Sequence, residues 1–171
     1  MTRFRLTLAL AALALCGLAA SCGGTPVVAS AKGGDIAQLP ADVLPQRLSG
    51  LEVRHEDVEV ELKQVRRSYA QAAGLWSLRR DDDRVQATLE IVRFFDEPRY
   101  SSAAFRRTIV NQIGSSRPAE TRMGDHAVYR TTGTKQTVAL WFSGRHMLLL
   151  SIRDDLKTPR ALIRRALEVS P

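Results

Sequence analysis

The side chains that could carry chemistry are few and lie far apart in the sequence. The three histidines are His55, His126 and His146. The last two would become neighbours if the strands that carry them pair, and a carboxylate such as Asp125 or Glu56 would then complete a zinc site. The alternative is three unrelated imidazoles at strand starts and helix approaches. We favour this alternative, and we expect no metal or other cofactor.

Motifs for catalysis are missing from the sequence. It contains no G-x-S-x-G, no H-E-x-x-H and no glycine-rich phosphate loop. The run Asp81-Asp82-Asp83 could attract Ca²⁺, but consecutive side chains point in different directions and the closing Glu of a calcium loop is absent. We interpret it as a solvated turn flanked by arginines. Ser68 and Ser151 have no neighbouring partner pattern for a nucleophile. We therefore expect that the protein is not an enzyme.

The first 21 residues have the pattern of an export signal. Arg3 and Arg5 precede an apolar run of about fifteen residues, shorter than the roughly twenty that span a bilayer. The stretch Ala19-Ala20-Ser21-Cys22 resembles the lipobox of bacterial lipoproteins, although Leu18 lies four residues before the cysteine and the family prefers Leu three before. The resemblance covers the leader only. It implies export by the Sec route, removal of residues 1–21, a diacylglycerol on the Cys22 thiol and usually a further acyl chain, such as palmitate, on its amine.

These lipids would hold the protein on the outer face of the cytoplasmic membrane. Each buried methylene contributes about 0.8 kcal/mol, so two or three chains form a durable anchor. A different cleavage, at Ala29-Ser30-Ala31, would release a secreted protein instead. Lipidation of Cys22 would leave the mature domain without a thiol, because the other cysteine, Cys16, lies in the leader. Disulfides and thiolate chemistry are then excluded from the domain.

The chain is basic, with a formal net charge of +7. Without Arg3 and Arg5, the mature chain would carry 23 basic and 18 acidic residues, a net charge of +5. Positive charge favours anionic lipid headgroups or wall polymers as partners. Four arginine pairs fall mostly on predicted helix faces or a turn, where solvated surface is the simpler interpretation than an anion site; they are Arg66-Arg67, Arg79-Arg80, Arg106-Arg107 and Arg164-Arg165. We expect no nucleic acid partner, because the chain is exported and has no interleaved aromatic pattern.

The sequence divides into a signal peptide at 1–21, a flexible tether at 22–42 and one domain at 43–171. The tether has no periodicity and is interrupted by glycine and proline. Within the domain, periodicity predicts three helices: 58–73, closed by Gly74; 102–113; and a last helix that begins at Thr158 with Pro159 in its first turn. The predicted strands are 75–78, 85–95, 126–130, 136–143 and 146–153.

These elements predict an α+β domain in which an antiparallel sheet of about five strands carries three helices packed on it. The order of a hairpin, a helix, a meander and a terminal helix loosely resembles the PsbP/Mog1-like α/β/α sandwich. This resemblance is one of architecture, so it implies a fold and no function.

Large apolar side chains are the remaining candidates for a site. Trp76, Trp141, Phe142 and Met147 either form core under the helices or contribute to a binding surface. We expect a membrane-anchored extracytoplasmic lipoprotein that acts as a non-catalytic binding or accessory module and docks another envelope protein. The alternative is a carrier or sensor of a small apolar ligand such as a lipid, which needs an enclosed, apolar-lined pocket of at least about 300 Å³.

Overall fold

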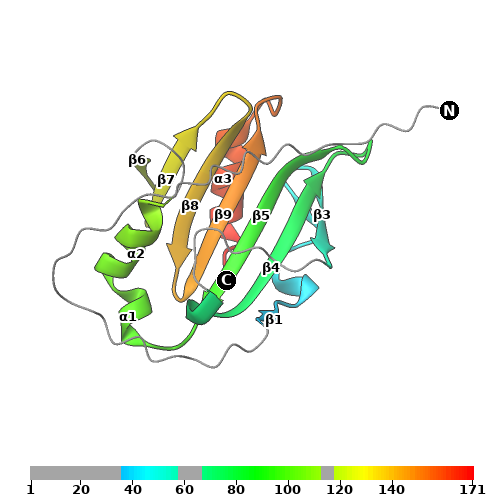
Figure 1. The fold of residues 1–171 in the computed structure, drawn as a ribbon. Coiled ribbons are helices and arrows are strands. Elements are labelled where there is room, and N and C mark those ends of the chain that lie inside the picture. The colour runs from blue at the N-terminus through cyan, green and yellow to red at the C-terminus, as the bar shows by residue number, and fades with distance from the viewer. Residues whose placement is uncertain (1–35, 58–66, 113–117) are drawn as a thin grey trace, which may run out of the picture.

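The computed structural model describes residues 36–57, 67–112 and 118–171 of the chain (Figure 1). The predicted signal peptide, Cys22 and most of the predicted tether lie outside these residues, as does the larger part of the first predicted helix. None of the helices in the described ranges is long and apolar enough to cross a membrane.

Within the described residues, nine strands form one sheet at the centre of the domain (Figure 1). Eight strands follow the order β2-β3-β4-β5-β9-β8-β7-β6 with antiparallel pairing throughout, whereas β1 pairs in parallel with β4. The strands are β1 (Ala37–Gln38), β2 (Arg47–Leu48), β3 (Leu51–Glu56), β4 (Ala70–Arg79), β5 (Val85–Phe94), β6 (Ala119–Met123), β7 (His126–Thr132), β8 (Gln136–Ser143) and β9 (His146–Arg153). The helices are α1 (Pro98–Ser101), α2 (Ala103–Val110) and α3 (Pro159–Glu168), with 3₁₀ turns at Ala41–Val43 and Arg67–Tyr69.

The predicted α+β class and antiparallel sheet are confirmed, but the prediction of about five strands is wrong. Two of the additional strands, β1 and β2, have two residues each and are too short to show a pattern. The other two, β3 and β6, have the sequences LEVRHE and AETRM, in which charged residues break up the apolar signal of a strand.

The chain around Gly74 is a strand, which contradicts the helix predicted at 58–73. Residues 58–66 lie outside the described part, but β4 already begins at Ala70 and Gly74 lies in its interior. β4 is buried on both sides of the sheet, since Ala72 and Trp76 pack in one core and Ala73 in the other. A strand covered on both faces shows no alternation of apolar and polar residues. Its alanines therefore gave a spacing that fits a helix equally well.

The elements that follow agree with the sequence patterns. Strands β8 and β9 have the predicted bounds, and β7 is two residues longer than predicted. Helix α2 lies inside the predicted range 102–113, and its N-cap Ser102 accepts a hydrogen bond from the backbone N–H of Phe105 at 3.2 Å. Pro159 occupies the first turn of α3 as expected, directly after Thr158. Its missing N–H costs nothing there, because that position has no intrahelical acceptor.

Two cores lie on opposite faces of the sheet, so the domain has three layers (Figure 1). On one face, Trp141 and Leu150 pack against Leu162 and Ile163 of α3. On the other face, buried residues of β5, β8 and β9 pack against Tyr100 of α1 and against α2. Burying one Leu or Ile side chain contributes about 1.5–3 kcal/mol, so each helix is fixed to the sheet by its apolar face. The opposite face of α3 remains exposed and carries arginines.

Candidate functional site

The four apolar residues considered as a binding surface lie in the two cores. Trp76 and Trp141 are 0% exposed in the core under α3. Met147 is also fully buried, but it lies on the other face of the sheet, next to the partly buried Phe142. The guanidinium carbon of Arg106 lies 5.2 Å from the centroid of the Phe142 ring. These four side chains therefore do not share one surface.

The three histidines occupy three different strands. β8 lies between β7 and β9, so the strands that carry His126 and His146 do not pair. His55 packs its ring against Trp76, with 5.0 Å between the ring centroids. Burial and the nearby Arg93 and Arg145 guanidinium groups lower the pKa of His146 below its usual value. Among the described residues, no three His, Cys, Asp or Glu side chains are close enough together to hold a metal ion.

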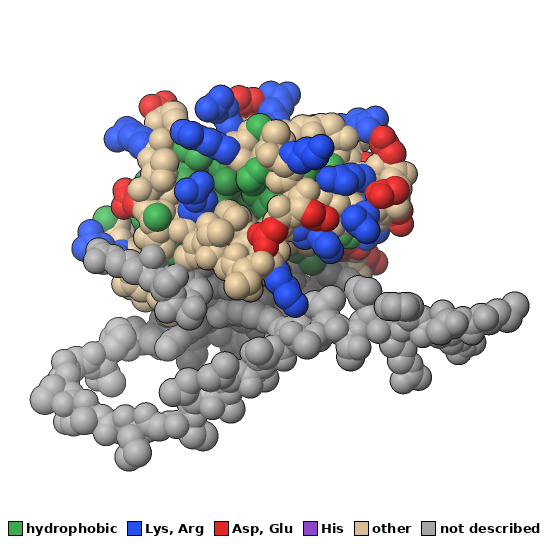
Figure 2. Space-filling view, turned by 90° about the horizontal axis from the view of Figure 1, so that it is seen from above, with side chains coloured by type: hydrophobic (Ala, Val, Ile, Leu, Met, Phe, Trp, Pro, Cys, Tyr) green, Lys and Arg blue, Asp and Glu red, His purple; other side chains and the backbone are tan. Residues whose placement is uncertain are grey.

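The aspartates of the β4–β5 turn are engaged by the chain itself. Asp81 Oδ1 accepts a hydrogen bond from Arg47 at 3.1 Å, and Asp82 Oδ1 accepts one from the backbone N–H of Arg84 at the same distance. Asp83 forms ion pairs with Arg54 at 2.7 Å and Arg79 at 3.5 Å. Figure 2 shows acidic and basic side chains intermixed over this turn, on the right of the view from above. At this end of the sheet, positive and negative charges are therefore matched.

A polar cluster next to this turn was not found by sequence reasoning. The Ser77 hydroxyl donates a hydrogen bond to Glu56, and the Arg79 guanidinium lies 3.1 Å from the same carboxylate. The hydrogen bond from Ser77 and then the bond and charge of Arg79 lower the pKa of Glu56. A carboxylate that is stabilised as an anion is a weaker base. The cluster therefore resembles a structural network more than a pair poised for proton transfer.

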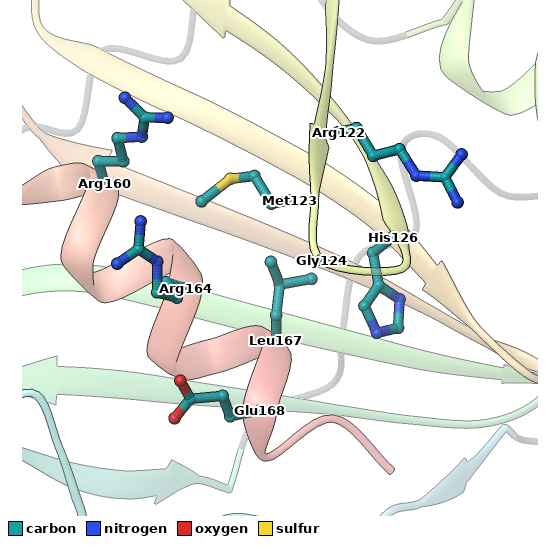
Figure 3. A pocket seen from close by; sticks show the side chains of 8 residues that line it. All are labelled: Arg122, Met123, Gly124, His126, Arg160, Arg164, Leu167 and Glu168. Carbon is teal, nitrogen blue, oxygen red and sulfur yellow. The ribbon is translucent and has the colours of Figure 1, made fainter.

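A pocket of about 490 Å³ lies between α3 and the β6–β7 hairpin (Figure 3). Two elements far apart in the sequence form it. The hairpin side consists of Arg122, Met123, Gly124 and His126, and the helix side of Arg160, Arg164, Leu167 and Glu168. The hairpin turns sharply because Gly124 takes a φ of 60°, in a two-residue turn that favours glycine at this position.

The pocket is basic, and the charge comes from one face of α3. Arg160 and Arg164 are one helical turn apart and both are exposed. In the described part of the chain neither has a carboxylate partner, and the single acid of the pocket, Glu168, is bound at 2.5 Å by Arg165. Two like charges at this spacing cost about 0.2–0.5 kcal/mol. Arg160 also lies in the first turn of the helix, where the helix dipole is itself positive.

The arginine side chains around the pocket point in different directions (Figure 3). Arg160 and Arg164 extend from α3 along the side that faces Met123, whereas the Arg122 side chain extends from the hairpin away from α3. The Arg122 guanidinium group therefore points away from the guanidinium groups of Arg160 and Arg164. Met123 and Leu167 form the apolar floor between the hairpin and the helix. The arrangement suits a small group with negative charge.

A second recess, of about 850 Å³, lies on the other side of the sheet between α2 and the strands β6 and β7. Its lining has mixed charge, with Arg106 and Arg107 on α2 and Glu120 on β6. It also reaches Pro118, directly after residues 113–117, which lie outside the described part. Both recesses have charged walls, which differ from the apolar lining that an acyl-chain carrier needs. We therefore consider the pocket at α3 the candidate site.

The sequence contained a partial signal for this site. Arg160 and Arg164 are spaced by four residues, and no acid lies three or four residues from Arg160 in the last helix. The sequence could not show that a hairpin more than thirty residues earlier would close the pocket. In comparisons with known protein families, curated proteins and solved structures, the chain matches none of them.

Proposed function

We propose that this protein is a lipid-anchored, non-catalytic binding module of the bacterial cell envelope, and that its α3 pocket binds a phosphate-bearing envelope component. The anchor rests on the leader and Cys22. The binding activity rests on the pocket of about 490 Å³ whose Arg160 and Arg164 have no acidic partner among the described residues. Docking to another envelope protein, as the sequence suggested, is compatible with this role.

The ligand class follows from the chemistry of the pocket. Arginine binds phosphate and carboxylate groups through paired N–H donors, and two arginines one helical turn apart can address one multivalent anion. The pocket lies open at the surface, so a headgroup or a repeating polymer can enter without unfolding any element. Anionic phospholipids and phosphate-bearing wall polymers are the ligands of this class that a lipid-anchored envelope protein would meet.

Thermal unfolding of the full-length chain in detergent tests the proposal. Trp76 and Trp141 are both fully buried and report unfolding by fluorescence. At constant ionic strength, inorganic phosphate should raise the melting temperature relative to chloride, because a ligand at a hundred times its Kd stabilises the folded state by about 2.7 kcal/mol. The double substitution Arg160→Gln with Arg164→Gln should remove this response.

Two controls give the result its meaning. Arg107→Gln neutralises an exposed helical arginine on the opposite face of the sheet and should keep the phosphate response. Micelles doped with phosphatidylglycerol or phosphatidylcholine distinguish a lipid headgroup from a soluble phosphate source. A response to phosphate alone indicates a polymer or soluble ligand, and a response to phosphatidylglycerol indicates a lipid. An unchanged response in the double variant, or no response to either probe, would contradict the proposal.

A further inference from the structure

The outermost strands at the two edges of the sheet differ in length. At one end, β2 has only two residues, and β1 pairs with β4 beyond the reach of β3. At the other end, β6 has five residues and, in the part of the chain that the structure describes, one neighbouring strand, β7 (Figure 1). Four of its five residues are exposed. An exposed edge of this length is a template for pairing with another strand.

The free backbone groups of β6 can be assigned from its pairing with β7. Met123 and His126 flank the two-residue turn, so they form a hydrogen-bonded pair. Hydrogen-bonded positions alternate, so Thr121 also directs its N–H and C=O toward β7. Glu120 and Arg122 direct theirs outward, away from the sheet. Among the described residues these groups have no hydrogen-bond partner, so Glu120 and Arg122 offer four backbone groups to an incoming strand.

The side chains of Glu120 and Arg122 in one copy are complementary in charge to the same side chains in a second copy. Glu120 and Arg122 have opposite charges and lie two positions apart, on one face of the sheet. Neither forms an ion pair with another described residue. In an antiparallel pair of two β6 strands centred on Thr121, each Glu120 lies opposite the Arg122 of the other copy. Opposite charges at facing positions favour the pair, and like charges disfavour it.

We propose that two copies of this chain pair through their β6 edges, antiparallel and with a twofold axis at Thr121, to form a continuous sheet. The charges fix the register, because a pair centred on Glu120 would place the two Glu120 carboxylates opposite each other and Arg122 opposite Pro118. The interface is isologous, as in most soluble dimers, since each copy contributes the same residues. It uses the Arg122 side chain, which points away from Arg160 and Arg164 of the α3 pocket (Figure 3).

Cysteine crosslinking tests the twofold axis. In the proposed pair Thr121 faces its own copy at a position without hydrogen bonds, where Cα atoms are about 4.5 Å apart and a disulfide fits. Thr121→Cys in the detergent-solubilised full-length chain should give a covalent dimer under mild oxidation. Arg130→Cys, at an exposed position of β7, should not, because two further strand spacings of about 4.8 Å separate the copies there. The parent chain gives the background from Cys16 and Cys22.

Charge reversal tests the register. Glu120→Arg or Arg122→Glu alone replaces both attractive pairs with repulsive ones, and either should weaken self-association about tenfold or more in sedimentation equilibrium. The double variant with both substitutions restores two opposite-charge pairs and should recover the parent dissociation constant. All positions are exposed, so folding should be unaffected.

Each remaining outcome overturns the proposal. If the parent chain stays monomeric in sedimentation equilibrium and Thr121→Cys gives no covalent dimer at the same concentrations, the β6 edge does not pair. Equal crosslinking at Arg130→Cys shows contact without the proposed axis. A double reversal that stays as weak as the single ones shows that Glu120 and Arg122 do not face each other. A Thr121→Cys chain that forms an adduct with a different protein in place of the dimer shows that β6 pairs with that protein and not with a second copy.

Discussion

Gly74 allows a quantitative test of the packing around Trp76. The residue lies inside β4, and a Cβ atom built on it would be 2.5 Å from Cη2 and 2.8 Å from Cζ3 of the Trp76 ring. It would also be 3.2 Å from Cβ of Leu39. Real Cβ atoms do not approach other atoms as closely as 2.8 Å, so Gly74→Ala forces the indole to move. The indole is 0% exposed, so it is enclosed by the core and can move only by displacing its neighbours.

The cost follows from how firmly the ring is held. The Trp76 Nε1–H donates a hydrogen bond to the carbonyl of Ala41 at 3.3 Å, and the His55 ring packs against the indole. Adding a methyl group to a filled core costs about 1–3 kcal/mol, and the fixed ring argues for the upper end. Alanine also reduces the conformational entropy of the unfolded chain relative to glycine, which stabilises the folded state by about 0.4–1 kcal/mol. We expect Gly74→Ala to lower the free energy of unfolding by about 2 kcal/mol.

Urea unfolding followed by fluorescence measures this loss, and two variants control it. Gly133→Ala, in the exposed β7–β8 turn, places its Cβ 3.6 Å from the nearest atom and should change stability by less than about 0.5 kcal/mol. In a Trp76→Leu background, Gly74→Ala should cost little, because the ring that it meets is gone. A urea midpoint for Gly74→Ala equal to that of Gly133→Ala would refute the reasoning. So would a loss of stability from Gly74→Ala that is as large in the Trp76→Leu background as in the parent.

Two further predictions concern the anchor and the response to acid. Cys22→Ala should lose the incorporation of labelled palmitate and move the protein out of the envelope fraction; retention as firm as that of the parent would contradict lipid anchoring. Burial and neighbouring arginines lower the pKa of His146 in the folded chain. Below pH about 6.5 the His146 imidazole therefore takes up a proton more readily in the unfolded chain than in the folded chain. The free energy of unfolding consequently falls as the pH falls. Urea midpoints at pH 7.5 and 5 should therefore differ less in His146→Gln than in the parent, and equal differences would show that His146 does not contribute.

The parts of the fold that the sequence predicted are those with strong local signals. The meander of β7, β8 and β9 has glycines in its turns, and α3 begins with Pro159 and continues with an apolar stripe. The strand predicted at 75–78 lies inside β4, but residues 70–73 of β4 were assigned to a helix. This part was missed because its signal depends on neighbours: an Ala-rich stretch becomes a strand when Trp76 and the flanking strands need small residues beside them. The edge strand β6 was not predicted because its residues are exposed and show no apolar pattern. Only its pairing with β7 identifies it as a strand.

The candidate site was less predictable than the fold. Arg164 was interpreted from the sequence as part of a solvated arginine pair, and its neighbour Arg165 is indeed paired with Glu168 on the surface. The helical spacing of Arg160 and Arg164 was present in the sequence, but its meaning depends on the hairpin around Gly124, which tertiary packing places beside α3. A pocket between distant elements leaves no periodic trace in either of them.

The distribution of charge supports a functional interpretation of these two arginines. At the β4–β5 turn, arginines and aspartates neutralise each other, as expected where charge serves only the surface. On α3, the exposed face has Arg160 in the first turn, where an acidic residue would stabilise the helix by about 0.3–1 kcal/mol. Replacing both Arg160 and Arg164 with Gln should therefore leave the ligand-free protein at least as stable as the parent while it removes the response to phosphate. A loss of stability without ligand would instead assign the two arginines to the fold.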